Sequence, residues 1–153
     1  MLGTMNDLEI EGLLNAETFG RIGCSNRERA YVVPISYAYD GEAIYGHSLD
    51  GLKLRMMREN PDVCFQIDSV EAVNKWRSVI AWGRYEELTG HEAMRGLKLL
   101  MERFAPLLGL DPNAPPPAHG ANAGGHGHGA GMPADAFVYR IVLKEKTGRF
   151  ERA

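Results

Sequence analysis

The sequence predicts a mainly β, α+β fold: a six-stranded antiparallel barrel with two or three peripheral helices. Three observations predict it. Several short segments alternate apolar and polar residues, an Asp40-Gly41 pair marks a tight hairpin, and the helical segments are too few to alternate with the strands. A doubly wound parallel sheet is therefore disfavoured and a small closed barrel is favoured. The chain of 153 residues fits one domain, residues 1–153.

The first half of the chain reads as a helix followed by three strands. Apolar residues recur at helical spacing from Leu8 to Leu14, behind Asn6 and Asp7, either of which can cap the helix. Between two of the strands, the Asp-Gly pair predicts a type I′ turn, because glycine accepts the positive φ that this turn needs. The three expected strands cover residues 19–25, 29–39 and 42–47.

The second half adds a short helix, two strands, a longer helix and a last strand. A helix over 50–60 ends before Pro61, since a residue that precedes proline leaves the α region. Thr89 and Glu92 have the spacing of a capping box, which opens the longer helix. We expect its apolar face to comprise Met94, Leu97, Met101, Phe104 and Leu108. The strands are expected at 63–68, at 76–88 with a bend at Gly83, and at 137–143.

Charge and composition exclude several classes of function. The formal net charge is −3, from 17 basic and 20 acidic side chains, which offers no general positive field for a nucleic acid. Apolar runs such as 79–82 are far shorter than the roughly 20 residues that cross a bilayer. The acidic start is unlike a signal peptide, and Cys24 and Cys64 form no metal or redox motif. We therefore expect a cytoplasmic protein that binds neither nucleic acid nor membrane.

Residues 112–134 contain only Gly, Ala, Pro, His, Asn and one Met. This segment has no apolar periodicity that could offset its chain entropy, so we expect a mobile insert outside the fold. Within it, His126 and His128 could contact a transition metal. Two imidazoles on a flexible chain fall short of the usual three or four metal ligands, so no metal site is predicted.

The segment from His47 to Lys53 joins the end of a strand to the start of a helix. Free backbone N–H groups and the helix dipole can bind an anion there, and Ser48 and Gly51 add a hydroxyl and close backbone approach. A phosphate site is one interpretation. The other is an ordinary helix capped by Asp50, with Lys53 as an incidental surface residue. The spacing is not that of a P-loop, so ATP or GTP chemistry is not indicated.

Two further segments carry groups that suit a cofactor. Trp76, Arg77 and Ser78 combine a flat aromatic ring, a cation and a hydroxyl, although a half-buried strand with a solvated arginine explains them equally. Pro34 lies inside a predicted strand and cannot donate a ladder hydrogen bond. Its position indicates an edge or a bulge, which is either an ordinary edge or a place where backbone groups meet a ligand.

Taken in order, these segments resemble a known family. The stretches 31–41, 44–53, 58–68 and 76–79 are similar to the pyridoxamine 5′-phosphate oxidase-related FMN-binding split barrels, especially the nitroimidazole-resistance-like branch. The similarity covers about residues 6–105 and the last strand. It implies the same kind of barrel that the hairpins predict.

The resemblance implies FMN bound in a cleft between the two subunits of a homodimer. It assigns the backbone of Val33, Pro34, Ile35 and Ser36 to the isoalloxazine ring, His47, Ser48 and Lys53 to the phosphate and ribityl chain, and Trp76, Arg77 and Ser78 to further cofactor contacts. His47 is also the candidate catalytic general acid, because the ordinary pKa of histidine lies near neutrality. A histidine that only packs at the end of a strand is the alternative.

The expected function is that of an FMN-dependent oxidoreductase, which transfers hydride or electrons to a small-molecule substrate with NADH or NADPH as the candidate reductant. A non-catalytic protein on the same barrel that stores or senses flavin, or that binds haem, is the alternative. A strand-rich domain without a cofactor is a third possibility. Residues 147–153 lack the Arg-x-His motif of true pyridoxamine phosphate oxidases, so oxidation of vitamin B6 is not expected.

Overall fold

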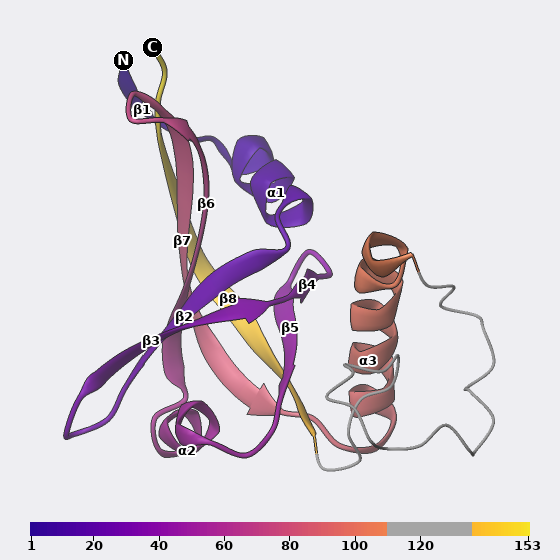
Figure 1. Ribbon diagram of the computed structural model, residues 1–153. Coiled ribbons are helices and arrows are strands. Elements are labelled where there is room, and N and C mark those ends of the chain that lie inside the picture. The colour runs from indigo at the N-terminus through magenta and orange to yellow at the C-terminus, as the bar shows by residue number, and fades with distance from the viewer. Residues whose placement is uncertain (110–135) are drawn as a thin grey trace, which may run out of the picture.

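The computed structural model describes residues 1–109 and 136–153 (Figure 1). The predicted mobile insert at 112–134, with His126 and His128, therefore lies outside the described residues. The elements are β1 (Leu2–Thr4), α1 (Asp7–Ala16), β2 (Phe19–Ser25), β3 (Ala30–Ser36), β4 (Ala38–Tyr39), β5 (Ala43–Ser48), α2 (Leu52–Glu59), β6 (Asp62–Ala72), β7 (Lys75–Glu87), α3 (Gly90–Phe104), a short 3-10 helix (Pro106–Leu108) and β8 (Phe137–Glu151).

The strands form one antiparallel sheet that closes into a barrel. Their order is β3-β2-β6-β7-β8-β5-β4, and β1 pairs with the far end of β8. β3 and β4 lie at opposite ends of this order, yet only Tyr37 separates them in the chain. The sheet must therefore curl until its two ends meet at Tyr37, whose N–H donates to the carbonyl of Thr18. This confirms the predicted split barrel with three helices.

Residues 1–109 and 136–153 form eight strands, where the sequence predicted six. The predicted strand 29–39 is divided into β3 and β4, because Tyr37 turns inward and is fully buried at the closure of the barrel. β1 was missed, since three residues are too few to show alternation. The last strand continues beyond the predicted 137–143 to Glu151, where it pairs with β1 and with the start of β7.

The hairpin between β4 and β5 forms as predicted, but its turn is not of type I′. Tyr39 pairs with Ile44, so Gly41 and Glu42 occupy the tip rather than Asp40 and Gly41. A type I′ turn needs positive φ at both central residues, and here only Gly41 has it, at 97°. The Asp40 carboxylate accepts hydrogen bonds from the N–H groups of Glu42 and Ala43, which fixes this arrangement.

The three helices begin differently from one another. Asn6 caps α1 in a capping box with Glu9, so the first of the two predicted caps is the one used. At α3, Thr89 is the N-cap, but neither of the predicted capping-box bonds forms. Glu92 instead lies 3.8 Å from Arg140 of β8. The ion pair with the sheet takes the carboxylate that a capping box would need.

The core fills the barrel, and α3 packs on its outside. In the barrel the ring of Tyr37 meets that of Phe65 edge to face, with 4.9 Å between centroids. α3 approaches β5 and β8 through Gly96 and Leu100 rather than through the whole predicted face. Of that face only Leu97 and Phe104 pack, whereas Met94, Met101 and Leu108 are exposed. The cause is Gly96, whose missing side chain lets the helix approach Val138 closely.

A long arm of β6, β7 and β8 rises from the barrel and ends near both chain termini (Figure 1). The β7–β8 register shifts between Trp82 and Gly83, which confirms the predicted bend at Gly83. A side chain at Gly83 would collide with the carbonyl oxygen of Val142, so glycine is required there. At the lower end of the molecule, α2 covers the barrel beside the end of β5 (Figure 1).

Candidate functional site

The end of β5 and the start of α2 form a cluster of polar groups. β5 ends at Ser48, and the N-cap of α2 is Gly51, with no side chain bonded to the first helical amides. The alternative in which Asp50 caps this helix is therefore wrong. Its carboxylate points instead toward Arg58, at 3.5 Å. The first N–H groups of α2 are thus available to another acceptor.

Lys53 lies in the first turn of α2 and is half-buried. Its Nζ is 5.8 Å from the ring centroid of Tyr139. None of the ion pairs formed by the described residues includes Lys53. Burial lowers the pKa of Lys53, which is the sign of an ammonium that lacks a counter-charge. An anion bound here would supply one.

His47 stands at the end of β5, close enough to Lys53 to feel its charge. The His47 residue is exposed to solvent in the single chain, yet neighbouring protein atoms partly desolvate its imidazole. This desolvation and, secondly, the Lys53 ammonium lower the pKa of His47. The imidazole of the free chain is therefore neutral near pH 7. A negative ligand between His47 and Lys53 would raise both pKa values. Ser48 also lies here, but its hydroxyl donates to the Leu49 carbonyl at 2.8 Å and would have to rotate to reach such a ligand.

The lowered pKa of His47 predicts a pH-dependent stability of the ligand-free protein. The unfolded chain takes up the His47 proton at a higher pH than the folded chain, so stability falls as the pH drops through about 6.5. Urea unfolding in phosphate-free buffer should show that His47→Gln reduces this loss. His91→Gln, at the exposed start of α3, is the matched control. An equal loss in all three proteins would contradict the assignment.

The β3 segment lies at one end of the strand order, as the position of Pro34 predicts. Pro34 is paired with Arg21 of β2 and is exposed, while Ile35 points into the barrel and is 7% exposed. Val33 also packs partly against the core, and Ser36 is half-buried. Only alternate residues of this segment therefore face outward.

The β7 segment lies on the arm. The indole N–H of Trp76 donates to the Glu151 carboxylate at 3.1 Å. The Ser78 hydroxyl oxygen accepts from the Gln66 amide at 3.2 Å. Arg77 is exposed on the opposite side of the strand from these two. Trp76 and Ser78 are thus the members of this segment that share a face.

The structure brings seven of the ten predicted residues into two groups. Residues directly opposite in antiparallel strands share a face, and this relation places Pro34, Ser36, Trp76 and Ser78 on the outer face of the sheet. His47, Ser48 and Lys53 lie instead at the end of the barrel. Val33, Ile35 and Arg77 face the other side of their strands.

Trp76 and His47 are widely separated within one chain. His47 pairs with Val138 of β8, whereas Trp76 pairs with Glu151 of the same strand. These positions are thirteen residues apart, about 40 Å of extended strand. A single ligand that touches both Trp76 and His47 would need a second copy of the chain.

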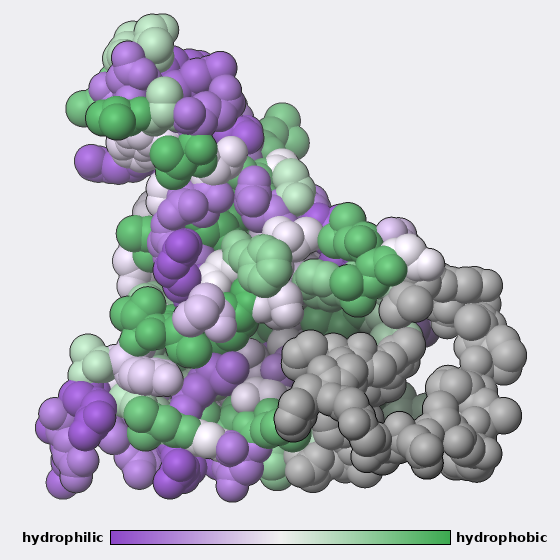
Figure 2. Space-filling view, viewed as in Figure 1, coloured by the Kyte–Doolittle hydropathy of each residue, from purple (hydrophilic) through white to green (hydrophobic). Residues whose placement is uncertain are grey.

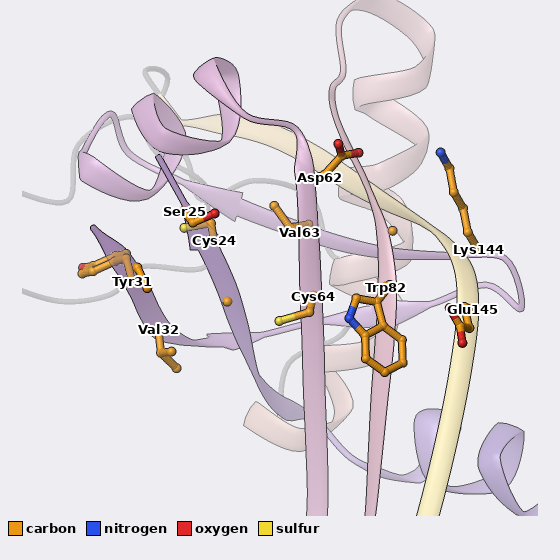
Figure 3. Close-up of a pocket in the computed structure, with 13 residues that line it drawn as sticks. Cys24, Ser25, Tyr31, Val32, Asp62, Val63, Cys64, Trp82, Lys144 and Glu145 are labelled. Carbon is orange, nitrogen blue, oxygen red and sulfur yellow. The ribbon is translucent and has the colours of Figure 1, made fainter. Parts of the chain in front are cut away.

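The outer face also contains a hollow of about 630 Å³ (Figure 3). Strands β2, β3, β6, β7 and β8 form its floor. The indole of Trp82 and the thiol of Cys64 lie beside one another on adjacent strands in this view, and Val32 stands on the far side. The volume is in the range of small-molecule sites, and the lining is mostly apolar.

The comparisons with known proteins agree with this fold. The family model described as pyridoxamine 5′-phosphate oxidase matches residues 6–124. The chain belongs to this family. The resemblance stated from the sequence is thereby confirmed. A relative from Rhizobium meliloti, an uncharacterised protein, is 35% identical over 104 residues, which are 65% of this chain and 69% of the relative.

Solved structures of the same fold cover nearly the whole chain. An FAD-binding protein from Mesorhizobium loti is 29% identical, with a TM-score of 0.73 and 99% of each chain covered. A candidate 5-nitroimidazole antibiotic resistance protein from Bacteroides thetaiotaomicron is 19% identical, with a TM-score of 0.68. The match covers 98% of this chain and 89% of that one, and at this identity it shows the fold alone.

The chain belongs to the pyridoxamine 5′-phosphate oxidase family but lacks the Arg-x-His tail motif of true pyridoxamine phosphate oxidases. Residues 147–151 are the last part of β8, paired with β1 and β7, rather than a free tail.

No helix within residues 1–109 and 136–153 has the length and apolar character that a bilayer crossing requires.

Sequence reasoning missed Tyr139, which lies beside Lys53. Its side chain is fully buried, and its hydroxyl has no hydrogen-bond partner among the described residues. Burial raises its pKa, with Tyr85 adding to the effect. The hydroxyl lies against Gly46, where a larger residue would displace it. Alternation placed Tyr139 in a strand but could not reveal an unpartnered hydroxyl.

Two tyrosine-to-phenylalanine changes should affect the free energy of unfolding differently. Tyr37→Phe removes a buried 2.7 Å bond from the Tyr37 hydroxyl to the Leu14 carbonyl and should lower the free energy of unfolding by about 1–2 kcal/mol. Tyr139→Phe removes a hydroxyl without a partner and should leave that free energy unchanged or raise it. Urea unfolding of both variants measures this. A clear loss in Tyr139→Phe would reveal a partner, such as a bound water.

Proposed function

We propose that the protein binds FMN at the interface of a homodimer and uses it as an oxidoreductase on a small molecule. The observation that carries the proposal is the half-buried Lys53, without an ion-pair partner among the described residues, at the start of α2. This first turn has no side-chain cap. The family to which the chain belongs supports a flavin as the ligand.

The donor set at the start of α2 fits a phosphate. The free amides behind Gly51 and the positive end of the helix dipole favour an anion. Lys53 supplies a cation whose lowered pKa an anion would restore, and His47 can become a second one. The similarity to an FAD-binding protein supports a flavin of either length.

The outer face of the sheet supports a dimer that covers the flavin ring. Large apolar side chains are exposed on it, among them Val32 at 67%, Ile80 at 40% and Trp82 at 42%. Hydrophobic residues also interrupt the polar surface of the arm and the body in the view of Figure 2. Such a face is typical of an interface between subunits. A second copy would bring the Trp76 and Ser78 of one subunit toward the Lys53 of the other.

When bound, the flavin supplies hydride or electron transfer, and the chain supplies binding, orientation and exclusion of water. Lys53 and the α2 amides hold the phosphate, and the outward residues of β3 and β7 face the ring. We propose His47 as the general acid: its imidazole is neutral in the free chain and would gain a proton when an anion binds beside it.

Reconstitution with riboflavin, FMN and FAD tests the proposal. We expect the protein to quench the fluorescence of FMN more strongly than that of riboflavin, to turn yellow, and to be bleached by NADH or NADPH with recovery on adding an acceptor. A yellow protein without turnover would support a flavin carrier instead, and a Soret band would indicate haem. A colourless protein that leaves flavin fluorescence unchanged would contradict the proposal.

A further inference from the structure

Four polar side chains form a hydrogen-bonded network on the outer face of the sheet. The Gln66 amide nitrogen donates to the Ser78 hydroxyl at 3.2 Å and to the Asp68 carboxylate at 3.0 Å. Arg21 donates to the amide oxygen of Gln66 at 3.3 Å, and its guanidinium also lies 3.6 Å from the Asp68 carboxylate. The network therefore spans strands β2, β6 and β7.

The direction of each bond in this network is fixed by chemistry. Arg21 can only donate, so it must face the amide oxygen of Gln66. The Asp68 carboxylate accepts from the amide nitrogen, which fixes the other end of Gln66. With both ends of Gln66 assigned, the oxygen of Ser78 is the acceptor of the remaining bond. The hydroxyl hydrogen of Ser78 is left free to donate elsewhere.

The network connects two of the predicted cofactor segments, and its neighbours on the same face are both apolar and polar: Ser78 stands opposite Arg149 of β8. Gln66 stands opposite Ile80, and Arg21 stands opposite Pro34 of the β3 segment. Gln66, Asp68 and Ser78 are each half-buried already. If a second copy and a flavin cover this face, the hydrogen bonds of the network become stronger because the local dielectric falls.

We infer that Arg21, Gln66 and Asp68 are positioning residues that hold Ser78 as a hydrogen-bond donor to the bound flavin ring. The inference rests on the proposed function. The ring edge offers carbonyl oxygens and ring nitrogens as acceptors for the Ser78 hydroxyl. Gln66 touches no flavin atom in this assignment. Gln66 donates a hydrogen bond to the Ser78 oxygen, which leaves the Ser78 hydroxyl hydrogen free to donate to the ligand.

A double-mutant cycle on flavin affinity tests this assignment. Gln66→Met keeps the length of the side chain but removes its hydrogen bonds, and Ser78→Ala removes the donor. Each change should weaken FMN about three- to tenfold, and the double variant should be no weaker than Ser78→Ala, because the two residues form one donor. Ser78→Thr keeps the hydroxyl and should restore most of the affinity. Thr147→Val, opposite Ile80 on the same face, is the matched control.

The midpoint potential of the bound flavin gives a readout that a purely structural role would not move. The reduced ring carries more negative charge, so a donor at its edge stabilises it more than the oxidised ring. Gln66→Met and Ser78→Ala should lower the potential to a similar extent, and Thr147→Val should not change it. Additive losses of affinity, or a Gln66→Met protein with wild-type potential, would overturn the inference alone. A wild-type chain that binds no flavin would overturn the proposed function as well.

Discussion

Replacing Lys53 by alanine should weaken FMN binding by about 1.5–3 kcal/mol, because the change removes a charge-assisted contact to the phosphate. Lys53 is half-buried at the start of α2, and its ammonium has no carboxylate partner among the described residues. Fluorescence titration of the purified variant with FMN measures the loss.

Riboflavin separates a phosphate contact from general damage to the site, because it lacks the phosphate. Its affinity should change little in Lys53→Ala. Lys98→Ala, which removes an exposed lysine of α3 paired with Glu102, should leave both affinities unchanged. If FMN and riboflavin lose the same affinity in Lys53→Ala, the lysine supports the structure and does not bind the phosphate. An unchanged FMN affinity would remove Lys53 from the site.

Replacing Trp82 by glutamate should abolish both the dimer and flavin binding while the chain stays folded. Trp82 is 42% exposed in the single chain, so the charge is tolerated there. In a dimer through the outer face, the same carboxylate would be buried without a partner, at a cost of roughly 3–5 kcal/mol. Sedimentation velocity gives the oligomeric state, FMN titration the affinity, and circular dichroism the fold.

Met94→Glu is the matched control for this change. Met94 is an exposed apolar residue, at 68%, but it lies on α3 and outside the outer face of the sheet. This variant should dimerise and bind flavin like the unaltered protein. If Trp82→Glu remains a dimer with full flavin affinity, the interface does not include this part of the outer face.

The local pattern of the sequence was sufficient to predict most of the secondary structure. Alternation in β2 and in the β6–β7 region, and the Asp-Gly signal before β5, specified strands whose one face is buried. The breaks were not predictable in the same way. The division at Tyr37 results from closure of the barrel, which depends on the meeting of strands that are distant in the sheet order.

The same limit applies to capping and to helix orientation. The Thr89–Glu92 spacing is correct for a capping box, but Arg140, some fifty residues later in the chain, draws Glu92 toward the sheet. The apolar residues of α3 did not reveal that Gly96 would face β5 and β8. Contacts between distant segments decided both outcomes.

The same distinction between local patterns and distant contacts applies to the candidate site. The loop from β5 to α2 could be predicted as an anion site, because a helix start beside a lysine is a local feature. Whether Lys53 and Trp76 contact one ligand depends on the association of two chains. The register along β8 places Trp76 far from His47, which lies beside Lys53. Tyr139 and the network around Gln66 depend on side-chain hydrogen bonding across strands. Residue spacing in the sequence does not predict either feature.

Sedimentation of the FMN-loaded protein, followed in the visible absorption band of the flavin, tests the shared site most directly. The account predicts that the visible absorbance sediments with a particle of twice the chain mass of 16.9 kDa, and that dilution releases flavin as the dimer dissociates. Flavin that remains bound to a particle of single-chain mass would contradict it.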